Sequence, residues 1–340
     1  MIRFKRVVTA IDCHTAGEPL RVITSGLPPI PGRTILEKRR YVSEHFDHVR
    51  KMLMFEPRGH SGMYGCIITP PTTPDGDFGV IFTHNEGYST MCGHGIIGVT
   101  KVAIETGMIE AQDGTKVIRI DAPAGRVTAF ADVVDGCVIS VGFENVPSFV
   151  FARDVQIEVS GIGKVPVDIA FGGAFYAWVE AHHLGMDVTP SRMDELVKRG
   201  MEIKYKVMDR MSVVHPLEPD LNGIYGTIIT GPVRPVAGGL DSNNVCIFAD
   251  AQIDRSPTGT GTSARMALLR DKGIMSDGMT LTNRSIIDTV FTGRIKGLTR
   301  VGGFDAVIPE VRGMAYISGF NQLVLEPDDP LPEGFRITGG

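Results

Sequence analysis

Two residues with nucleophilic side chains, the thiol of Cys92 and the hydroxyl of Thr258, occupy the same position in two segments that repeat each other. Counted from either residue, glycines follow after one, three and fifteen positions. A thiol whose pKa is lowered is a base near neutral pH, whereas a threonine hydroxyl without an adjacent base is confined to hydrogen bonding. The pair predicts one proton-transferring group and one hydrogen-bonding group, one in each half of a duplicated chain.

Each of these residues precedes a predicted helix. The first helix is expected to begin at Cys92 and to end at Gly107, and apolar residues on nearly its whole circumference are typical of a buried helix. The second helix is expected over 261–271, with Gly273 as its stop. Both stops are preceded by an acidic residue two positions earlier, which strengthens the case for a duplication.

Both helices start at a Gly-x-Gly, where backbone N–H groups have no partner within the helix and the helix dipole adds positive charge. A single Gly-x-Gly can serve only to allow a tight turn, but two in the same phase favour an anion site. If a pseudo-two-fold axis relates the halves, the two helix N-termini face one another across a cleft. The duplication then predicts that one small carboxylate is held between them.

The place of Cys92 before a helix bears on its chemistry. A helix N-terminus lowers the pKa of a thiol from about 8.5, which makes Cys92 a candidate base. The alternative is a buried structural cysteine, since cysteine is among the most buried residue types. Apolar strand neighbours favour that alternative for Cys66, Cys137 and Cys246.

Thr258 and Asp254 also have two interpretations each. Thr258 is a candidate for hydrogen bonding to a ligand, or it serves only as an N-cap. Asp254, four residues earlier, is a candidate to pair with a cationic amine, or it forms a local turn or an ion pair with Arg255.

Histidine spacing predicts no metal site, because the chain has no His-x-His or His-x-x-x-His pair. The adjacent His182 and His183 are expected at the surface. The other histidines considered as ligands are His14, His60, His84 and His94.

Composition limits the class of protein. The 340 residues, of which 43% are hydrophobic and 21% charged, suffice for two globular domains. The net charge of -5 with scattered Lys and Arg gives no basic surface for nucleic acid, and no apolar run reaches the roughly 18 residues of a membrane span. Five cysteines without a Cys-x-x-Cys pair and an N-terminus unlike a signal peptide indicate a cytoplasmic protein. A small-molecule ligand is therefore expected.

Alternating apolar residues predict strands around both helices, so the fold class is α/β (α+β) in two half-domains. The first half-domain is expected over 1–150 with a C-terminal segment of about 315–340, and the second over 151–314. Strands are expected at 4–10, 19–25, 61–69, 78–82, 171–179, 224–230 and 244–249, a polar turn at 12–17, and helical segments at 34–55 and 190–207.

Three segments resemble the proline racemase family, and together they extend the resemblance over essentially the whole chain. They are Met91–Gly95 with the sequence Met-Cys-Gly-His-Gly, Asp254–Ala264 with Asp-Arg-Ser-Pro-Thr-Gly-Thr-Gly-Thr-Ser-Ala, and the opening Asp12–Pro19. The resemblance implies two pseudo-symmetric domains of the diaminopimelate epimerase type. In that fold each domain wraps a mixed sheet around a central helix, and the ligand lies in the cleft between the domains.

The chain departs from the family pattern at one position. Racemising and epimerising members carry a second cysteine where this chain has Thr258, and their two thiols stand on opposite faces of a proline-like ring. With threonine there, the chain is similar to the trans-3-hydroxy-L-proline dehydratase subgroup. The resemblance also implies a homodimer and a reaction that needs no cofactor.

Site residues follow from the same resemblance. It implies that Asp254 binds the ring nitrogen of an imino-acid substrate. It also implies that backbone amides hold the carboxylate and stabilise charge that grows on it, as in an oxyanion hole. These amides belong to Gly93, His94, Gly259 and Thr260.

Chemistry favours the same subgroup, because racemisation needs a base on one ring face and an acid on the other. In trans-3-hydroxy-L-proline the hydroxyl and the Cα proton share a face, so Cys92 alone can remove the proton and return it to the leaving hydroxide. The expected reaction is dehydration to Δ1-pyrroline-2-carboxylate and water, catalysed by a cofactor-independent hydro-lyase. The alternatives are a 4-hydroxyproline 2-epimerase or proline racemase, and, from another class, a non-catalytic imino-acid binding protein.

Overall fold

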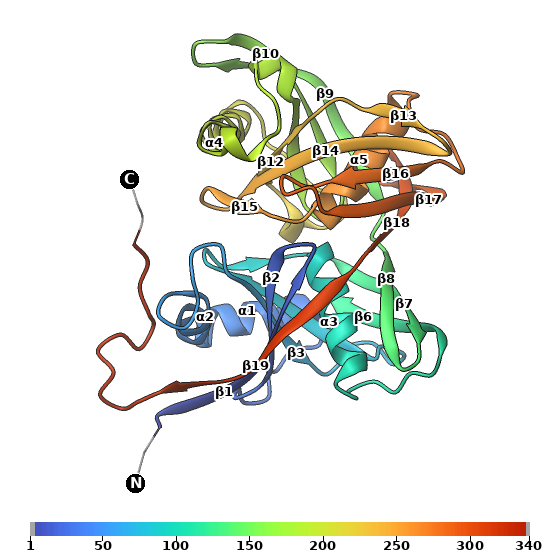
Figure 1. Cartoon of the computed structure of the whole chain (residues 1–340). Coiled ribbons are helices and arrows are strands. Elements are labelled where there is room, and N and C mark those ends of the chain that lie inside the picture. Colours follow the sequence, from blue (N-terminus) through green and yellow to red (C-terminus); the bar gives the residue numbers. More distant parts are fainter. Residues whose placement is uncertain (1–3, 338–340) are drawn as a thin grey trace. The chain divides into compact units, whose positions relative to one another are not determined.

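The computed structural model describes residues 4–337 and consists of two compact units (Figure 1). Unit 1 comprises Met1–Val141 and Met314–Gly340, and unit 2 comprises Gly142–Gly313. The expected boundary at residue 150 falls inside β9 (Ser148–Val159), a strand of unit 2. Among the described residues, no helix combines the length and the apolar character needed to cross a membrane.

Unit 1 is a mixed sheet wrapped around helix α3 (Gly93–Glu105). Its strands pair in the order β19–β1–β2–β3–β4–β6–β7, with β5 also on β4; the pairs β2/β3 and β4/β6 are parallel. Helix α3 contacts β19 and β7 at the two ends of this row as well as β1 and β2 between them. The elements are β1 (Arg6–Thr15), β2 (Glu18–Ser25), α1 (Ile35–His45), α2 (Asp47–Met54), β3 (Tyr64–Thr69), β4 (Phe78–His84), β5 (Tyr88–Ser89), β6 (Gly114–Ala122), β7 (Gly125–Val134), β8 (Cys137–Glu144) and β19 (Ala315–Leu325).

Unit 2 surrounds helix α5 (Gly259–Asp271) in the same manner. Its pairings run β9–β10–β11–β12–β14–β16–β17–β18 and close from β18 back to β9; β11/β12 and β14/β16 are parallel. Helix α5 contacts β9, β10, β17 and β18. The elements are β10 (Gly163–Phe171), β11 (Phe175–Glu180), η1 (Ala181–Leu184), η2 (Pro190–Arg192), α4 (Met193–Arg210), η3 (Pro219–Leu221), β12 (Ile224–Thr230), β13 (Arg234–Val236), β14 (Gly239–Phe248), β15 (Gln252–Asp254), β16 (Thr280–Arg284), β17 (Val290–Val301) and β18 (Phe304–Gly313).

The two units repeat one order of elements. In each unit one parallel pair of strands is connected through an amphipathic helical segment, α1 with α2 in unit 1 and α4 in unit 2. The other parallel pair is connected through a short edge strand and the buried helix, β5 with α3 in unit 1 and β15 with α5 in unit 2. The mixed α/β fold with one central helix per half, predicted from the repeat, is confirmed.

The two central helices also end alike. Each has 13 residues, and each is followed by a glycine in the left-handed region, Gly107 with φ of 75° and Gly273 with φ of 68°. Ile109 N–H donates to Ala103 at 2.9 Å, and Met275 N–H donates to the equivalent Leu269 at 3.1 Å. The glycine spacing therefore identified the C-terminal ends of both helices.

The helical segments expected over 34–55 are confirmed as two helices, α1 and α2. Two other local expectations were wrong. Asp12 and the residues up to Thr15 belong to β1 rather than to a turn. The segment expected as one strand over 171–179 is the β10–β11 hairpin, whose turn contains Gly172 and Gly173. A Cβ at Gly172 would lie 2.2 Å from the carbonyl oxygen of Thr260, so this turn requires glycine to approach the first turn of α5.

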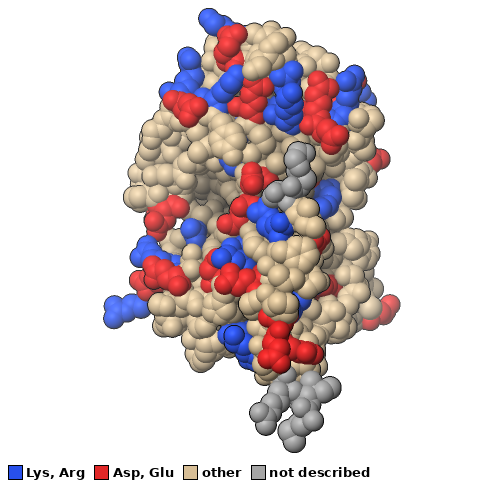
Figure 2. Space-filling view, turned by 90° about the vertical axis from the view of Figure 1, so that its left-hand side faces the viewer, with Lys and Arg blue, Asp and Glu red and all other residues tan. Residues whose placement is uncertain are grey.

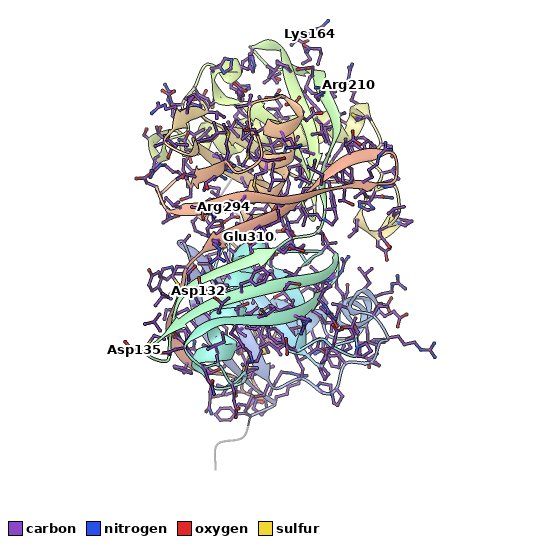
Figure 3. The ribbon with its side chains drawn as sticks, turned by 90° about the vertical axis from the view of Figure 1, so that its right-hand side faces the viewer. Asp132, Asp135, Lys164, Arg210, Arg294 and Glu310 are labelled. Carbon is purple, nitrogen blue, oxygen red and sulfur yellow. The ribbon has the colours of Figure 1, made fainter. Side chains whose placement is uncertain are left out.

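On the face drawn in Figure 2, acidic and basic side chains are interspersed rather than segregated by sign. On β17 and β18, Arg294 lies opposite Glu310 in the strand register (Figure 3), and the Glu310 carboxylate pairs with Lys296 at 3.4 Å and Arg312 at 3.0 Å. This distribution agrees with the expectation of a small-molecule ligand.

Candidate active site

In unit 1, Cys92 is the N-cap of α3 and has relaxed backbone angles, φ -147° and ψ 108°. Its sulfur accepts a hydrogen bond from the N–H of Gly95 at 3.2 Å, so the thiol lies over the first turn of the helix. A Cβ at Gly95 would lie 3.0 Å from this sulfur and 2.7 Å from Phe82 Cε1. Glycine is therefore required here for packing, and the partial positive charge of the helix N-terminus stabilises a thiolate at this position.

The side chain of His94 is a neighbour of Cys92 that the sequence interpretation missed, because only its backbone amide was considered. Its Nδ1 lies 3.2 Å from Cys92 Sγ. Thr15 Oγ1 donates to the His94 carbonyl at 2.8 Å, and the ring packs edge-on against Tyr64 with centroids 4.7 Å apart. The Cys-x-His spacing at a helix start was the available signal, since residues N-cap and N2 lie on adjacent sides of the first turn.

In unit 2, Thr258 precedes α5 but does not cap it. Its side chain makes no hydrogen bond to the helix, and its hydroxyl oxygen is buried without a hydrogen-bond partner among the residues that the structure describes. The interpretation of Thr258 as only an N-cap is therefore wrong. A buried hydroxyl without a partner costs free energy, on the order of 1–3 kcal/mol, so this oxygen is available to a ligand.

The backbone of Thr258 is strained. Its φ of 64° and ψ of 101° place a β-branched residue in a region that favours glycine. Such residues cost about 1–3 kcal/mol and persist where surrounding contacts fix them, often at functional sites. Among the described non-glycine residues with positive φ, Thr258 is the only β-branched one.

Asp254 is the last residue of β15 and is buried. Its Oδ1 accepts the N–H of Ser256 at 2.8 Å, and Ser256 Oγ accepts the N–H of Thr258 at 3.1 Å. The local turn considered for Asp254 is thus present, formed by one carboxylate oxygen. Asp254 is linked to Thr258 through two hydrogen bonds and lies near the start of α5.

Cys92 is itself buried, so its place at the start of α3 rather than its burial sets it apart from the other cysteines. Cys66 and Cys246 are buried as expected, whereas Cys137, the first residue of β8, is exposed, so the prediction for Cys137 was wrong. Burial raises the pKa of the Cys66 thiol well above its ordinary value and raises that of Cys13 to about 12. Neither Cys13 nor Cys66 is suited to act as a base at neutral pH.

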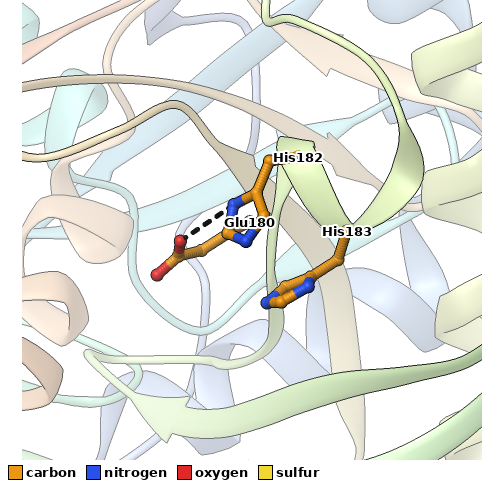
Figure 4. Close-up of side chains that lie close together, drawn as sticks. All are labelled: Glu180, His182 and His183. Atoms are coloured by element: carbon orange, nitrogen blue, oxygen red, sulfur yellow. Dashed lines mark ion pairs between the residues drawn. The ribbon is translucent and has the colours of Figure 1, made fainter.

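A histidine pair in unit 2 meets one carboxylate (Figure 4). Exposed His182 and His183 have ring centroids 3.9 Å apart, and His182 Nδ1 lies 3.2 Å from Glu180 Oε2. These are the residues that come close enough to share a metal ion in the part of the chain that the structure describes. They lie at η1, on a different element from the helix start that carries Thr258, and Lys272 adds positive charge beside His183.

The two helix starts offer complementary chemistry. The start of α3 holds a thiol against backbone amides, which suits proton abstraction next to a carboxylate. The start of α5 holds a hydroxyl without a hydrogen-bond partner among residues 4–337, with a buried carboxylate nearby. A thiol held against helix amides, as at the start of α3, is typical of enzymes that remove a proton next to a carboxylate.

Comparison with known proteins identifies the family of the chain. The family model described as proline racemase matches residues 10–336, so the chain belongs to the proline racemase family. It is 50% identical to a trans-3-hydroxy-L-proline dehydratase of Bacillus thuringiensis subsp. konkukian, over 99% of this chain and all of the relative. It is 44% identical, with the same coverage, to a 3-hydroxyproline 2-epimerase of Burkholderia multivorans.

A solved structure supports the fold. The crystal structure of a hydroxyproline epimerase from Agrobacterium vitis, with bound trans-4-OH-L-proline, superimposes with a TM-score of 0.92 at 34% identity. The match covers 99% of this chain and 97% of that one. The family fold expected from the sequence motifs is confirmed.

Proposed function

We propose that the protein dehydrates trans-3-hydroxy-L-proline to Δ1-pyrroline-2-carboxylate and water. The observation that carries the proposal is Thr258, whose unpartnered hydroxyl stands where α5 begins, at the place that Cys92 holds before α3. A single thiol suits a reaction in which the proton and the leaving group share one ring face. Relatives of this chain named trans-3-hydroxy-L-proline dehydratase, at up to 50% identity over full length, support the same reaction.

In the proposed mechanism the Cys92 thiolate takes the Cα proton. The electron pair left at Cα forms a double bond to C3 and expels the C3 hydroxyl, which leaves as water with the proton returned by Cys92. The resulting enamine tautomerises to Δ1-pyrroline-2-carboxylate by moving a proton from nitrogen to C3. These steps balance without an oxidant, a reductant or a cofactor.

The substrate is proposed to be held by its two charged groups. The backbone amides of Gly93, His94, Gly259 and Thr260 bind the carboxylate and stabilise negative charge that develops on it. Asp254 binds the ring nitrogen. The Thr258 hydroxyl hydrogen-bonds to the substrate, and no step requires Thr258 to remove a proton.

The experiment is an incubation of the protein with trans-3-hydroxy-L-proline in deuterated water. A dehydratase forms a pyrroline that reacts with o-aminobenzaldehyde. Failure to detect pyrroline under conditions in which the protein remains folded would refute this function.

The second candidate is epimerisation at C2, which the 44% identical 3-hydroxyproline 2-epimerase brings into consideration. This candidate includes the 4-hydroxyproline 2-epimerase and proline racemase activities. In each of them water would take the role of the second thiol. The same incubation, repeated with 4-hydroxyproline and proline, separates these activities from dehydration. An epimerase or racemase returns deuterated substrate of inverted configuration. A non-catalytic binder would show no turnover and would bind ligand equally well as Cys92→Ala.

We also propose a cytoplasmic homodimer. The supporting features are the family resemblance and a cysteine pattern without a Cys-x-x-Cys pair. Light scattering coupled to size-exclusion chromatography measures the mass, and a monomer would contradict the dimer without bearing on the reaction.

A further inference from the structure

The peptide that enters Thr258 is held by side chains from two strands outside its own segment. The carbonyl oxygen of Pro257 accepts Asn244 Nδ2 at 3.2 Å and Asn283 Nδ2 at 3.1 Å. Asn244 lies on β14 and Asn283 on β16, and both side chains are buried. We call Asn244 and Asn283 the amide clamp. Because a carbonyl oxygen only accepts hydrogen bonds, the nitrogen of each amide must face it.

Further contacts fix the same stretch of backbone. Thr262 Oγ1 donates to the Pro257 carbonyl at 3.3 Å and accepts a hydrogen bond from Asn283 Nδ2 at 2.9 Å. The N–H of Thr258 is bound by Ser256 Oγ, and its carbonyl accepts the N–H of Thr262 at 2.6 Å. Both peptide planes around Thr258 are therefore held, which explains how its positive φ persists.

The equivalent position in unit 1 shows what the strain changes. A Cβ at Gly95 would lie 3.0 Å from Cys92 Sγ, whereas a Cβ at the equivalent Gly261 would lie 3.0 Å from Thr258 Cγ2. The methyl group of Thr258 thus takes the place over the first turn that the sulfur takes in unit 1. The hydroxyl is directed elsewhere and makes no bond to the helix.

A threonine with ordinary N-cap angles would place its oxygen on the N–H of the third helical residue. That bond would direct the oxygen toward the helix and use one of its acceptor positions, so the hydroxyl would no longer have its present orientation for hydrogen bonding to a ligand. The amide clamp opposes this relaxation, because it fixes the Pro257 carbonyl that would rotate with the peptide.

We propose that Asn283, with Asn244, is a positioning residue that holds Thr258 in its strained conformation and so keeps the Thr258 hydroxyl available to the substrate. This inference rests on the proposed function, because it assigns a purpose to the hydroxyl of that site. It makes the specificity of the site depend on backbone geometry as well as on the exchange of cysteine for threonine.

The test is a double-mutant cycle between Asn283→Ala and Thr258→Val, with kcat for pyrroline formation as the readout. If the clamp acts through the hydroxyl, Asn283→Ala lowers kcat about ten- to hundredfold in the wild-type background, as expected when one hydrogen bond to the reacting substrate is lost. In the Thr258→Val background the same change lowers kcat by less than about twofold, because the coupled group is already absent. KM changes less than kcat.

Asn145→Ala is the matched control. Asn145 Nδ2 is also buried and also supports α5, through Ser263 Oγ at 2.9 Å and the Gly172 carbonyl at 2.7 Å, but it does not contact the peptide before Thr258. We expect Asn145→Ala to lower the unfolding temperature with kcat near that of the wild type. The rate of Cys92 alkylation should be unchanged in every variant, which shows that the start of α3 is intact.

Several results would overturn the inference. An equal loss of kcat from Asn283→Ala in both backgrounds would mean that the clamp does not act through the hydroxyl. If Thr258→Val has the kcat of the wild type, the Thr258 hydroxyl has no role in the reaction and the inference fails. Pyrroline formation by the wild type would still support the proposed dehydratase function. If Asn283→Ala does not fold, Asn244→Ala takes its place in the cycle. A crystal structure of the folded variant should show Thr258 with negative φ and its hydroxyl on the N–H of Gly261.

Discussion

At the residue scale, Cys92 and Thr258 differ in more than the atom that they present. The sulfur of Cys92 accepts a hydrogen bond from the helix that it precedes, whereas the oxygen of Thr258 is buried and has no hydrogen-bond partner in the described part of the chain. A thiol gains from helix amides because they stabilise its charged form. The Thr258 hydroxyl, which we propose binds a ligand, instead makes no hydrogen bond to the helix amides.

The unpartnered hydroxyl predicts opposite effects on stability and activity. Thr258→Val keeps the shape of the side chain and removes a buried polar atom, so we expect the unfolding free energy to stay constant or to rise by about 1 kcal/mol. We expect kcat for pyrroline formation to fall about a hundredfold. Thermal unfolding and steady-state kinetics on one preparation measure both.

Thr260→Val is the control for that prediction. The Thr260 hydroxyl lies 2.7 Å from the buried phenol of Tyr176, so its removal leaves the phenol without this partner. We expect a loss of about 1–3 kcal/mol of stability. If Thr258→Val is destabilised as much as Thr260→Val, the Thr258 hydroxyl has a structural partner and the argument for a ligand is contradicted.

At the element scale, α4 is attached to the β9–β10 turn through Glu202. Its carboxylate accepts the N–H of Ser160 at 2.7 Å, pairs with Lys206 at 2.7 Å and with Arg199 at 3.1 Å. Burial by itself raises the pKa of Glu202, but these hydrogen bonds outweigh it and lower the pKa from 4.5 to about 2. The folded state therefore favours the charged carboxylate.

The depressed pKa gives a pH-dependent contribution to stability. It is fully present above the ordinary pKa of 4.5 and is lost as the pH falls through about 2. We expect Glu202→Gln to cost about 1.5–3 kcal/mol of unfolding free energy at neutral pH. The difference from wild type should shrink below pH 4.5, as measured by urea unfolding at a series of pH values.

Glu195→Gln provides the comparison on the same helix, because the ion pair of Glu195 among residues 4–337 is with Arg192, at 3.1 Å, and both side chains are largely exposed. Its effect should be small and should not vary strongly with pH. A Glu202→Gln difference that stays constant from neutral pH to pH 2 would contradict the assigned linkage.

The sequence predicted those elements whose signals are local. Glycine spacing located both central helices, because Gly107 and Gly273 supply the left-handed residue that ends each one. The β10–β11 hairpin was missed although Gly172-Gly173 is itself a local turn signal. What the sequence could not predict is the approach of Gly172 to the Thr260 carbonyl, a contact between distant segments. Local patterns contain no record of such contacts.

The candidate site was also predictable only as far as local sequence motifs allow. The motifs identified Cys92, Thr258 and Asp254, but not the φ of 64° at Thr258. That angle depends on Asn244 and Asn283, whose strands become neighbours only when β14 pairs with β16. Residues that act by fixing the conformation of another residue form no sequence motif with it, so the sequence does not predict them.

At the scale of the whole molecule, duplication supplies two scaffolds of one design with different residues at their helix starts. The equivalent glycines of the two units have equivalent surroundings. A Cβ at Gly95 would lie 2.7 Å from Phe82 and a Cβ at Gly261 2.7 Å from Ile228. The proposed reaction uses groups at both helix starts, so it predicts that a change at either start lowers activity.

Alanine at either glycine tests that prediction. Gly95→Ala and Gly261→Ala each force a methyl group against the residue that precedes the helix, and we expect each to lower kcat/KM for pyrroline formation at least about tenfold. Gly107→Ala and Gly273→Ala are the matched controls, since both sites are open but have positive φ. They should cost about 1 kcal/mol of stability with kcat/KM unchanged. If Gly261→Ala leaves kcat/KM at the wild-type value while Gly95→Ala abolishes it, the start of α5 takes no part in the reaction, and a mechanism confined to unit 1 must replace the one proposed.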